Sequence, residues 1–245
     1  MFPSLKKTAF QILFCSIAIY STSVLSQSRS FDCTKKLTTV QSNLALDSLQ
    51  SRYSNVQTLT ASFSQLSKNA ALDMTETSSG SVQFKKPGMM RWDYSEPEKQ
   101  VLTLNKNEVR FYQESENQGF IDNVSQVLLS DLPVSFLAGI GNIKDSFNLI
   151  SGCNGSDGTI LTLSPKQKTT GQNSGKIEEA KIKELKIIVE DSSFLPKGAS
   201  VLDSSDNETA ILLSKLFIGE EIKDSSFTFN FPRGADVVNK TNGLG

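Results

Sequence analysis

The feature that most constrains this chain is a succession of short segments, from Leu59 almost to the C-terminus, in which apolar and polar residues alternate. A period of two is typical of β-strands with one buried face. About ten or eleven such segments follow one another, and so many antiparallel strands must curl strongly or close. The predicted strands are Leu59–Gln65, Ser81–Lys86, Met90–Tyr94, Val101–Leu104, Glu108–Tyr112, Phe147–Ile150, Thr159–Ser164, Ala180–Glu190, Phe194–Leu202, Thr209–Leu216 and Phe227–Phe231.

Two other segments have helical spacing. Cys33–Asn55 is predicted to be a helix with Asp32 as its N-cap. Apolar residues recur at near-helical intervals along this segment and just beyond it, at Leu37, Val40, Leu44, Leu49 and Val56. Val124–Ile140 is predicted to form one or two short apolar helices hinged near Pro133. No linker divides the strands, so we expect a single mainly β (α+β) domain.

A strongly curled sheet needs apolar material against its concave face, and two short helices cannot fill much of that space. Such a fold can enclose a cavity, and a lining of Phe, Met, Leu and Ile would suit hydrocarbon. Alternation places Phe84, Lys86, Met90, Trp92 and Tyr94 on one face, which we expect to be concave. Ordinary core packing is the alternative for each of these residues.

The sequence contains no histidine, so the commonest general base and the commonest zinc ligand are both absent. It also has no Gly-rich phosphate loop and no CxxC, HExxH or GxSxG pattern. We therefore predict a binding protein without a cofactor or a metal site, and not an enzyme. An enzyme that acts on lipid or glycan is the alternative.

The formal charge restricts the partners. The whole chain has 25 basic and 26 acidic residues. Phosphate backbones are bound by clustered Lys and Arg, so nucleic acid is not an expected partner.

The N-terminus is organised like a secretory signal peptide. Lys6 and Lys7 form a positive region, and a mostly apolar stretch from Thr8 to Tyr20 follows. Cleavage is predicted near Ser26–Gln27, which gives a leader of residues 1–26 and a mature domain of residues 27–245. A retained membrane anchor is the alternative, although the apolar stretch is short for one. Residues 239–245 are predicted to be a flexible tail.

Export would leave two cysteines. Cys15 lies inside the leader, after Leu13 and Phe14, where a lipoprotein signal would have small residues. We predict that Cys33 and Cys153 form a disulfide in an oxidising compartment. Closing a loop of about 120 residues would stabilise the fold by roughly 4 to 5 kcal/mol in the chain-entropy model. Two unpaired cysteines are the alternative.

The stretch from Lys85 to Pro97 resembles LolA, the family of periplasmic carriers that move lipoproteins from the inner to the outer membrane. It contains a basic residue, Pro, Gly, an apolar pair, Arg-Trp and a second Pro. The resemblance extends from about Leu49 to Val238. Its further parts are Phe63-x-Gln65, Gly80, Leu132-Pro133…Phe136-Leu137…Gly139 and Phe227-x-Phe229…Pro232…Gly234…Val237.

This resemblance implies a half-open antiparallel β-barrel of about eleven strands, with a short helical lid over its cavity. It implies a monomeric periplasmic carrier of lipoproteins that binds their acyl chains. Its partners would be an inner-membrane lipoprotein-releasing ABC transporter and an outer-membrane receptor lipoprotein. The expected acyl-chain or lid contacts are Phe63, Phe84, Lys86, Met90, Trp92, Tyr94, Val127, Leu128, Leu132, Phe136 and Leu137.

Lys86 departs from the family pattern. Many LolA sequences have an Arg before the motif proline, and that Arg bonds to the lid and holds the empty form closed. Lysine donates from a compact ammonium and lacks the planar fork of guanidinium. We therefore expect Lys86 to form a looser latch.

An interaction module that senses a lipid or lipoprotein, like RseB, is the alternative function. Such a sensor usually has a second domain, for which this chain has no room. The receptor at the end of the transport path would need a lipobox cysteine, and the sequence lacks one.

Overall fold

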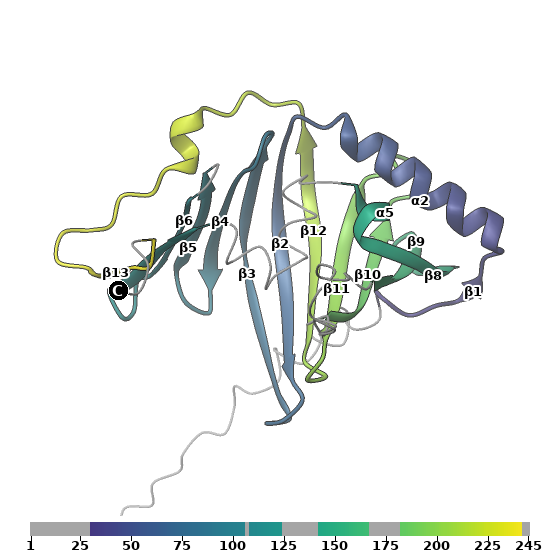
Figure 1. Ribbon diagram of the computed structural model, residues 1–245, viewed down its shortest axis with the longest axis horizontal. Helices are drawn as coiled ribbons and strands as arrows, with labels where there is room; N and C mark the ends of the chain where they lie inside the picture. The colour runs from purple at the N-terminus through teal and green to yellow at the C-terminus, as the bar shows by residue number, and fades with distance from the viewer. Residues whose placement is uncertain (1–29, 106–107, 124–141, 167–181, 242–245) are drawn as a thin grey trace, which may run out of the picture.

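A computed structural model describes residues 30–105, 108–123, 142–166 and 182–241 of the chain. The described residues form one sheet of 13 strands in the order β1-β8-β9-β10-β11-β12-β2-β3-β4-β5-β6-β7-β13 (Figure 1). The strands are β1 (Lys35–Lys36), β2 (Thr58–Asn69), β3 (Met74–Lys85), β4 (Met89–Glu96), β5 (Gln100–Asn105), β6 (Glu108–Gln113), β7 (Gln118–Asn123), β8 (Phe147–Asn154), β9 (Thr159–Pro165), β10 (Ile182–Val189), β11 (Pro196–Asp203), β12 (Glu208–Ile218) and β13 (Asp236–Asn239).

The sheet is antiparallel except where β13 runs parallel to β7. Its two outermost strands, β1 and β13, lie at opposite ends of the strand order and do not pair with each other. The prediction of a mainly β, half-open antiparallel barrel is therefore confirmed.

The strand predictions differ from the structure in two ways. Strands β1, β7 and β13 were not predicted, because they are short or interrupted by Gly and Asp. The predicted strand Phe227–Phe231 is wrong, because Asp224–Phe227 is a 3-10 helix, η1, and no strand follows until β13. In this segment the apolar residues Phe229 and Phe231 are separated by a polar one, and both rings pack against Tyr112 of β6, with centroids 5.4 and 6.1 Å apart. The alternation therefore reflects side-chain packing and not a strand. Alternation alone does not distinguish such packing from backbone pairing.

The helix predicted for Cys33–Asn55 is α2, which spans Thr39–Ser54. It begins six residues later than predicted, and its N-cap is Thr38 instead of Asp32. The Thr38 hydroxyl accepts from the N–H of Gln41, whose side chain in turn accepts from the N–H of Thr38. The preceding residues cannot be helical because β1 pairs with β8.

The buried stripe of α2 also differs from the prediction. Val40 and Leu44 are 69% and 60% exposed, so they do not belong to the core. The buried residues of the helix are Ser42, Leu46, Leu49 and Tyr53. Their spacing of three or four residues marks the face that meets the sheet.

We call the face of the sheet that carries Phe63 the inner face. Residues paired across neighbouring strands point to the same side, so this face continues over β12, β11, β10 and β9. At that end it is filled by α2 and by the short helix α5 (Ile143–Ser146), in a cluster with Leu161, Leu185 and Ile187. Gly152 of β8 lets α2 approach closely, because a Cβ there would lie 2.5 Å from the Ser42 hydroxyl.

The outer face is covered by segments from both ends of the chain. Phe31 packs there with Ile160 and Ile188. The C-terminal segment, residues 219–241, leaves β12 and contacts β4 and β5 through η1 before it reaches β7 (Figure 1). Arg91 donates to the carbonyl of Ser226, and Arg110 to that of Phe229.

Cys33 and Cys153 form the predicted disulfide, with Cα atoms 5.6 Å apart and a sequence separation of 120. The bond fastens the N-terminal segment to β8, next to the pairing of β1 with that strand.

Other predictions concern residues outside the described ranges: the signal peptide of residues 1–26 and the helices of Val124–Ile140. The predicted tail begins within β13, which includes Asn239, and the N–H of Lys240 donates to the carbonyl of Ile121. No helix in the described part of the chain is both long enough and apolar enough to cross a membrane.

Candidate functional site

The inner face carries two apolar rows of side chains, one across strands β2 to β6 and the other across β2 to β7. The strand register brings these residues side by side, because every direct pair points to the same face. The first row is Leu59, Phe84, Met90, Leu104 and Val109. The second row is Ala61, Val82, Trp92, Leu102, Phe111 and Phe120. Most of these residues, with Phe63, form a single buried cluster distinct from the one beneath α2.

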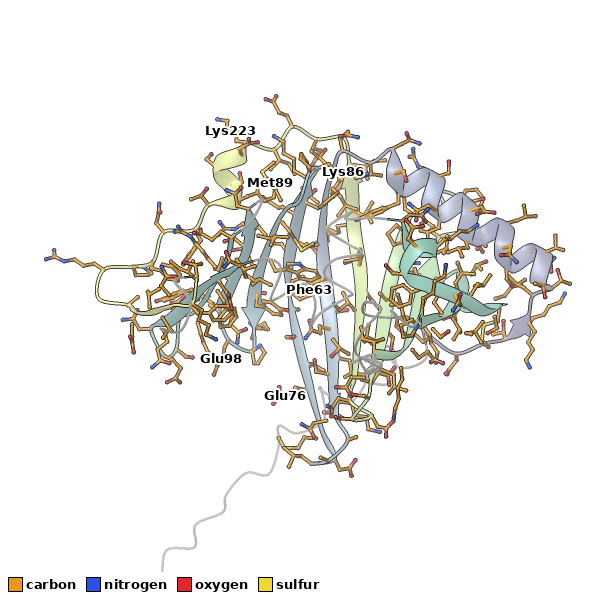
Figure 2. The ribbon with its side chains drawn as sticks, in the orientation of Figure 1. Phe63, Glu76, Lys86, Met89, Glu98 and Lys223 are labelled. Atoms are coloured by element: carbon orange, nitrogen blue, oxygen red, sulfur yellow. A yellow bond between two sulfur atoms is a disulfide. The ribbon has the colours of Figure 1, made fainter. Side chains whose placement is uncertain are left out.

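Three aromatic rings form the centre of this cluster. The Phe63 ring stands edge-on to Trp92 and Tyr94, with centroids 4.6 and 4.9 Å apart. Figure 2 places Phe63 midway along the sheet. Gly80 makes this arrangement possible, because a Cβ there would collide with the Asp93 carbonyl oxygen and lie 2.9 Å from the Phe63 ring.

The polar atom of Trp92 is satisfied inside the cluster. Its indole N–H donates to the sulfur of Met90 at 2.6 Å. A buried indole N–H that already has a partner leaves the surrounding surface apolar. The flexible thioether of Met90 can also adapt to different neighbours.

Lys86 lies at the end of this face, just beyond β3 and beside the end of α2 (Figure 2). Its ammonium donates to the carbonyl oxygens of Tyr53 and Ser54, at 3.0 and 2.7 Å. It also lies 5.7 Å from the centroid of the Tyr53 ring. Burial lowers the pKa of the Lys86 ammonium and raises that of the Tyr53 phenol.

The structure thus brings five of the predicted contacts, Phe63, Phe84, Met90, Trp92 and Tyr94, onto one face. Lys86 lies outside the strand, and the described contacts of its side chain are with α2. The remaining predicted contacts lie outside the described residues: Val127, Leu128, Leu132, Phe136 and Leu137.

Several buried residues of the same rows were not predicted as contacts, such as Leu59, Val82, Leu104 and Val109. Each of them is apolar within an alternating segment, which is a signal of burial. The missing information was the register between strands, which decides the residues that lie beside Phe84 and Trp92.

Metal chemistry has no support in the described residues, where no three His, Cys, Asp or Glu side chains gather in a way that could hold an ion.

Comparison with known proteins identifies the family. The family model described as "Outer membrane lipoprotein carrier protein LolA" matches residues 54–230, which include both apolar rows and the Lys85–Pro97 motif. The chain belongs to the LolA family. This places it among carrier proteins and not among enzymes, in agreement with the prediction.

Relatives named outer-membrane lipoprotein carrier protein agree with this LolA assignment. One from Pseudomonas entomophila is 31% identical over 183 residues, covering 74% of this chain and 82% of its own. One from Pseudomonas aeruginosa is 28% identical over 197 residues, covering 79% and 87%. A solved structure of an uncharacterized conserved protein from Thermus thermophilus covers 81% of this chain and 99% of its own, with 13% identity and a TM-score of 0.49.

Proposed function

We propose that this protein is a periplasmic carrier that binds the acyl chains of lipoproteins on its inner face. It takes lipoproteins released from the inner membrane by an ABC transporter and delivers them to an outer-membrane receptor lipoprotein. The observation that carries the proposal is the pair of apolar rows across β2 to β7, in a member of the LolA family. The names of its relatives support the same cargo.

The energy of acyl burial is large enough for this role. Removing one methylene from water is worth about 0.8 kcal/mol, so burying one long acyl chain is worth on the order of 10 kcal/mol. A carrier must also release its cargo, so part of that energy has to be offset.

Because the inner face is already buried, exposing it to cargo costs free energy, and this cost offsets part of the energy of acyl binding. Phe84, Met90 and Trp92 are already buried by the protein itself. Cargo can contact them only by displacing what covers them, and the cost of that displacement subtracts from the energy gained on binding. Direction then follows from the difference in affinity between successive partners, without a nucleotide in the periplasm.

The single tryptophan of the chain provides the test of acyl binding. Trp92 is the only Trp, and it lies in the second apolar row, so its fluorescence reports on the inner face alone. We expect a synthetic diacylated lipopeptide to change Trp92 emission saturably, and the same peptide without acyl chains to leave it unchanged. Equal responses to both peptides would contradict the proposal.

Two neighbouring residues of β5 give a matched pair of variants. Leu102 pairs with Trp92 on the inner face, whereas Val101 points to the outer face, and both are half-buried. We expect Leu102→Asn to weaken lipopeptide binding at least tenfold, because it places an amide against the acyl chain. Val101→Asn should leave binding within about twofold of the unmodified protein.

The delivery steps need a separate test. Mature protein added to spheroplasts should release newly made lipoproteins into the supernatant. It should then pass them to outer-membrane vesicles that contain the receptor. Release without transfer, or transfer to vesicles without a receptor, would contradict the proposed path.

A further inference from the structure

The inner face changes from apolar to polar along the direction of its strands. A third row follows the two apolar ones: Phe63, Gly80, Tyr94, Gln100, Gln113 and Gln118. Figure 2 shows Lys86 at the end of the sheet nearest the first row, and Glu98 toward the end nearest the third row. Three glutamines and the hydroxyl of Tyr94 therefore border the apolar rows at the end of the sheet that is opposite Lys86.

This polar row has hydrogen-bonding groups of both kinds. The Tyr94 hydroxyl donates to the Gln65 side-chain oxygen at 3.2 Å, and the Gln65 amide donates to the Ser67 hydroxyl at 3.0 Å. The Gln113 amide donates to a Glu98 carboxylate oxygen at 2.8 Å and to the Ser115 hydroxyl at 3.3 Å. Gln100 lies between Tyr94 and Gln113 in the register and is half-buried. Each amide offers two N–H donors and an acceptor.

The donors at the opposite end are engaged inside the protein. The Lys86 ammonium is held by the carbonyls of Tyr53 and Ser54, and the Trp92 N–H by the sulfur of Met90. Asp122, which pairs with Val109 at the end of the first row, has a carboxylate that can only accept. Within the described part of the chain the Gln100 side chain makes no hydrogen bond, so a ligand with carbonyl oxygens finds amide N–H groups there, whereas the end of the first row offers an acceptor.

We propose that the polar row, Tyr94, Gln100 and Gln113 together with Gln65, holds the ester and amide groups of the lipid-modified cysteine of the cargo. This inference rests on the proposed carrier function. Ester carbonyls only accept hydrogen bonds, so they pair directly with the Gln100 amide. They pair with the Tyr94 hydroxyl and the Gln65 and Gln113 amides in exchange for the partners that these groups have without cargo. The acyl chains then run across the second row toward Met90 and Phe84. The peptide of the lipoprotein leaves at the Glu98 end of the sheet.

Two synthetic lipopeptides test this orientation, one with diacylglyceryl esters and one with dialkyl ethers in their place. Both bury the same hydrocarbon, but the ether analogue lacks the carbonyl oxygens. By calorimetry, we expect the unmodified protein to bind the ester about 5- to 30-fold more tightly than the ether. Equal affinities would overturn the inference and leave the carrier function intact. Failure of both lipopeptides to bind would count against the carrier function itself.

A double variant of the polar row and a tyrosine control on the outer face separate hydrogen bonding to the ester from a general effect on the fold. Tyr94→Phe with Gln100→Leu should reduce the preference for the ester to about twofold or less, while the affinity for the ether stays unchanged. Tyr112→Phe is the matched control, because Tyr112 lies on the outer face and its hydroxyl donates to Asn117 at 2.9 Å. This control should keep the full preference, and its loss there would overturn the inference.

Photocrosslinking checks the direction of the chains. A lipopeptide with a diazirine at the acyl terminus should label peptides that contain Phe84, Met90 or Leu104. One with the diazirine beside the cysteine should label peptides that contain Gln100 or Gln113. The reverse pattern would overturn the proposed orientation.

Discussion

The ammonium nitrogen of Lys86 lies 2.7 Å from the carbonyl oxygen of Ser54, the last residue of α2. Tyr53 supplies a second carbonyl at 3.0 Å. A cation at this position also interacts favourably with the negative end of the helix dipole. The contact therefore joins the end of α2 to the turn before β4, at the apolar end of the inner face.

Removing this contact should destabilise the protein. We expect Lys86→Leu to lower the free energy of unfolding by about 1 to 2 kcal/mol, because two carbonyls lose a charged donor. Lys86→Arg should cost less, since it keeps a cation within reach of the same carbonyls. Lys99→Leu is the control. The Lys99 ammonium lies 3.8 Å from the Glu114 carboxylate, and this exposed pair stabilises the fold by at most about 0.5 kcal/mol. Urea unfolding of the four proteins measures the differences.

Lys86→Leu should also alter cargo transfer. If the contact stabilises the protein without its cargo, losing it shifts the equilibrium toward the loaded protein. We expect tighter retention of lipopeptide and transfer to the receptor slowed only severalfold. Transfer kinetics to receptor-containing vesicles measure this, and a complete block would show a latch much stronger than a single lysine can provide.

Gly80 should tolerate no side chain. We expect Gly80→Ala to lower the free energy of unfolding by roughly 2 kcal/mol or more, because the added Cβ collides with the Asp93 carbonyl and pushes against Phe63. The lipopeptide affinity of the folded variant should fall too, since Phe63 packs directly on Trp92. Ser81→Ala on the opposite face is the matched control, with an expected change within about 0.5 kcal/mol. Equal stability of the two variants would contradict the assigned packing.

Alternation of apolar and polar residues predicted most of the strands. It placed Phe84, Met90 and Trp92 on one face because side chains in a strand alternate strictly between its two sides. It could not predict the polar row, because Gln100 and Gln113 become neighbours only through the register of β4, β5 and β6. Register depends on distant pairing and is not encoded within any one strand.

Tertiary contacts also decided the start of α2. Asp32 is a suitable N-cap residue by type, but β1 and the Cys33–Cys153 disulfide hold the neighbouring chain in an extended form. The apolar residues Val40 and Leu44 fit a helical period, yet they lie on the side of α2 that faces away from the sheet. The position of the sheet, and not the period, selected the buried stripe.

The disulfide should affect stability and leave cargo binding intact. Replacing Cys33 and Cys153 by Ser should lower the free energy of unfolding by about 3 to 5 kcal/mol, because the bond closes a loop of 120 residues. Lipopeptide affinity should stay within twofold, since Cys153 packs with Phe31 and Ile160 on the outer face. Dithiothreitol should destabilise the unmodified protein by a similar amount and have no effect on the double variant. A loss of binding on reduction would contradict this separation of the two faces.

We expect the side chain of Phe227 to contribute most to holding the C-terminal segment, residues 219–241, against the outer face of the sheet. Its side chain is 0% exposed and packs with Met89 and Ile222 on the outer face. We expect Phe227→Ala to lower the free energy of unfolding by about 3 to 5 kcal/mol, because it leaves a cavity under this segment. Phe217→Ala is the matched control: the same truncation at a ring that is 56% exposed removes little buried area and should cost less than about 1 kcal/mol. Because Phe227 lies on the face opposite the apolar rows, the folded variant should keep its lipopeptide affinity. A tenfold loss of that affinity would mean that the segment shapes the inner face through β4, the strand that carries both Met89 and Trp92.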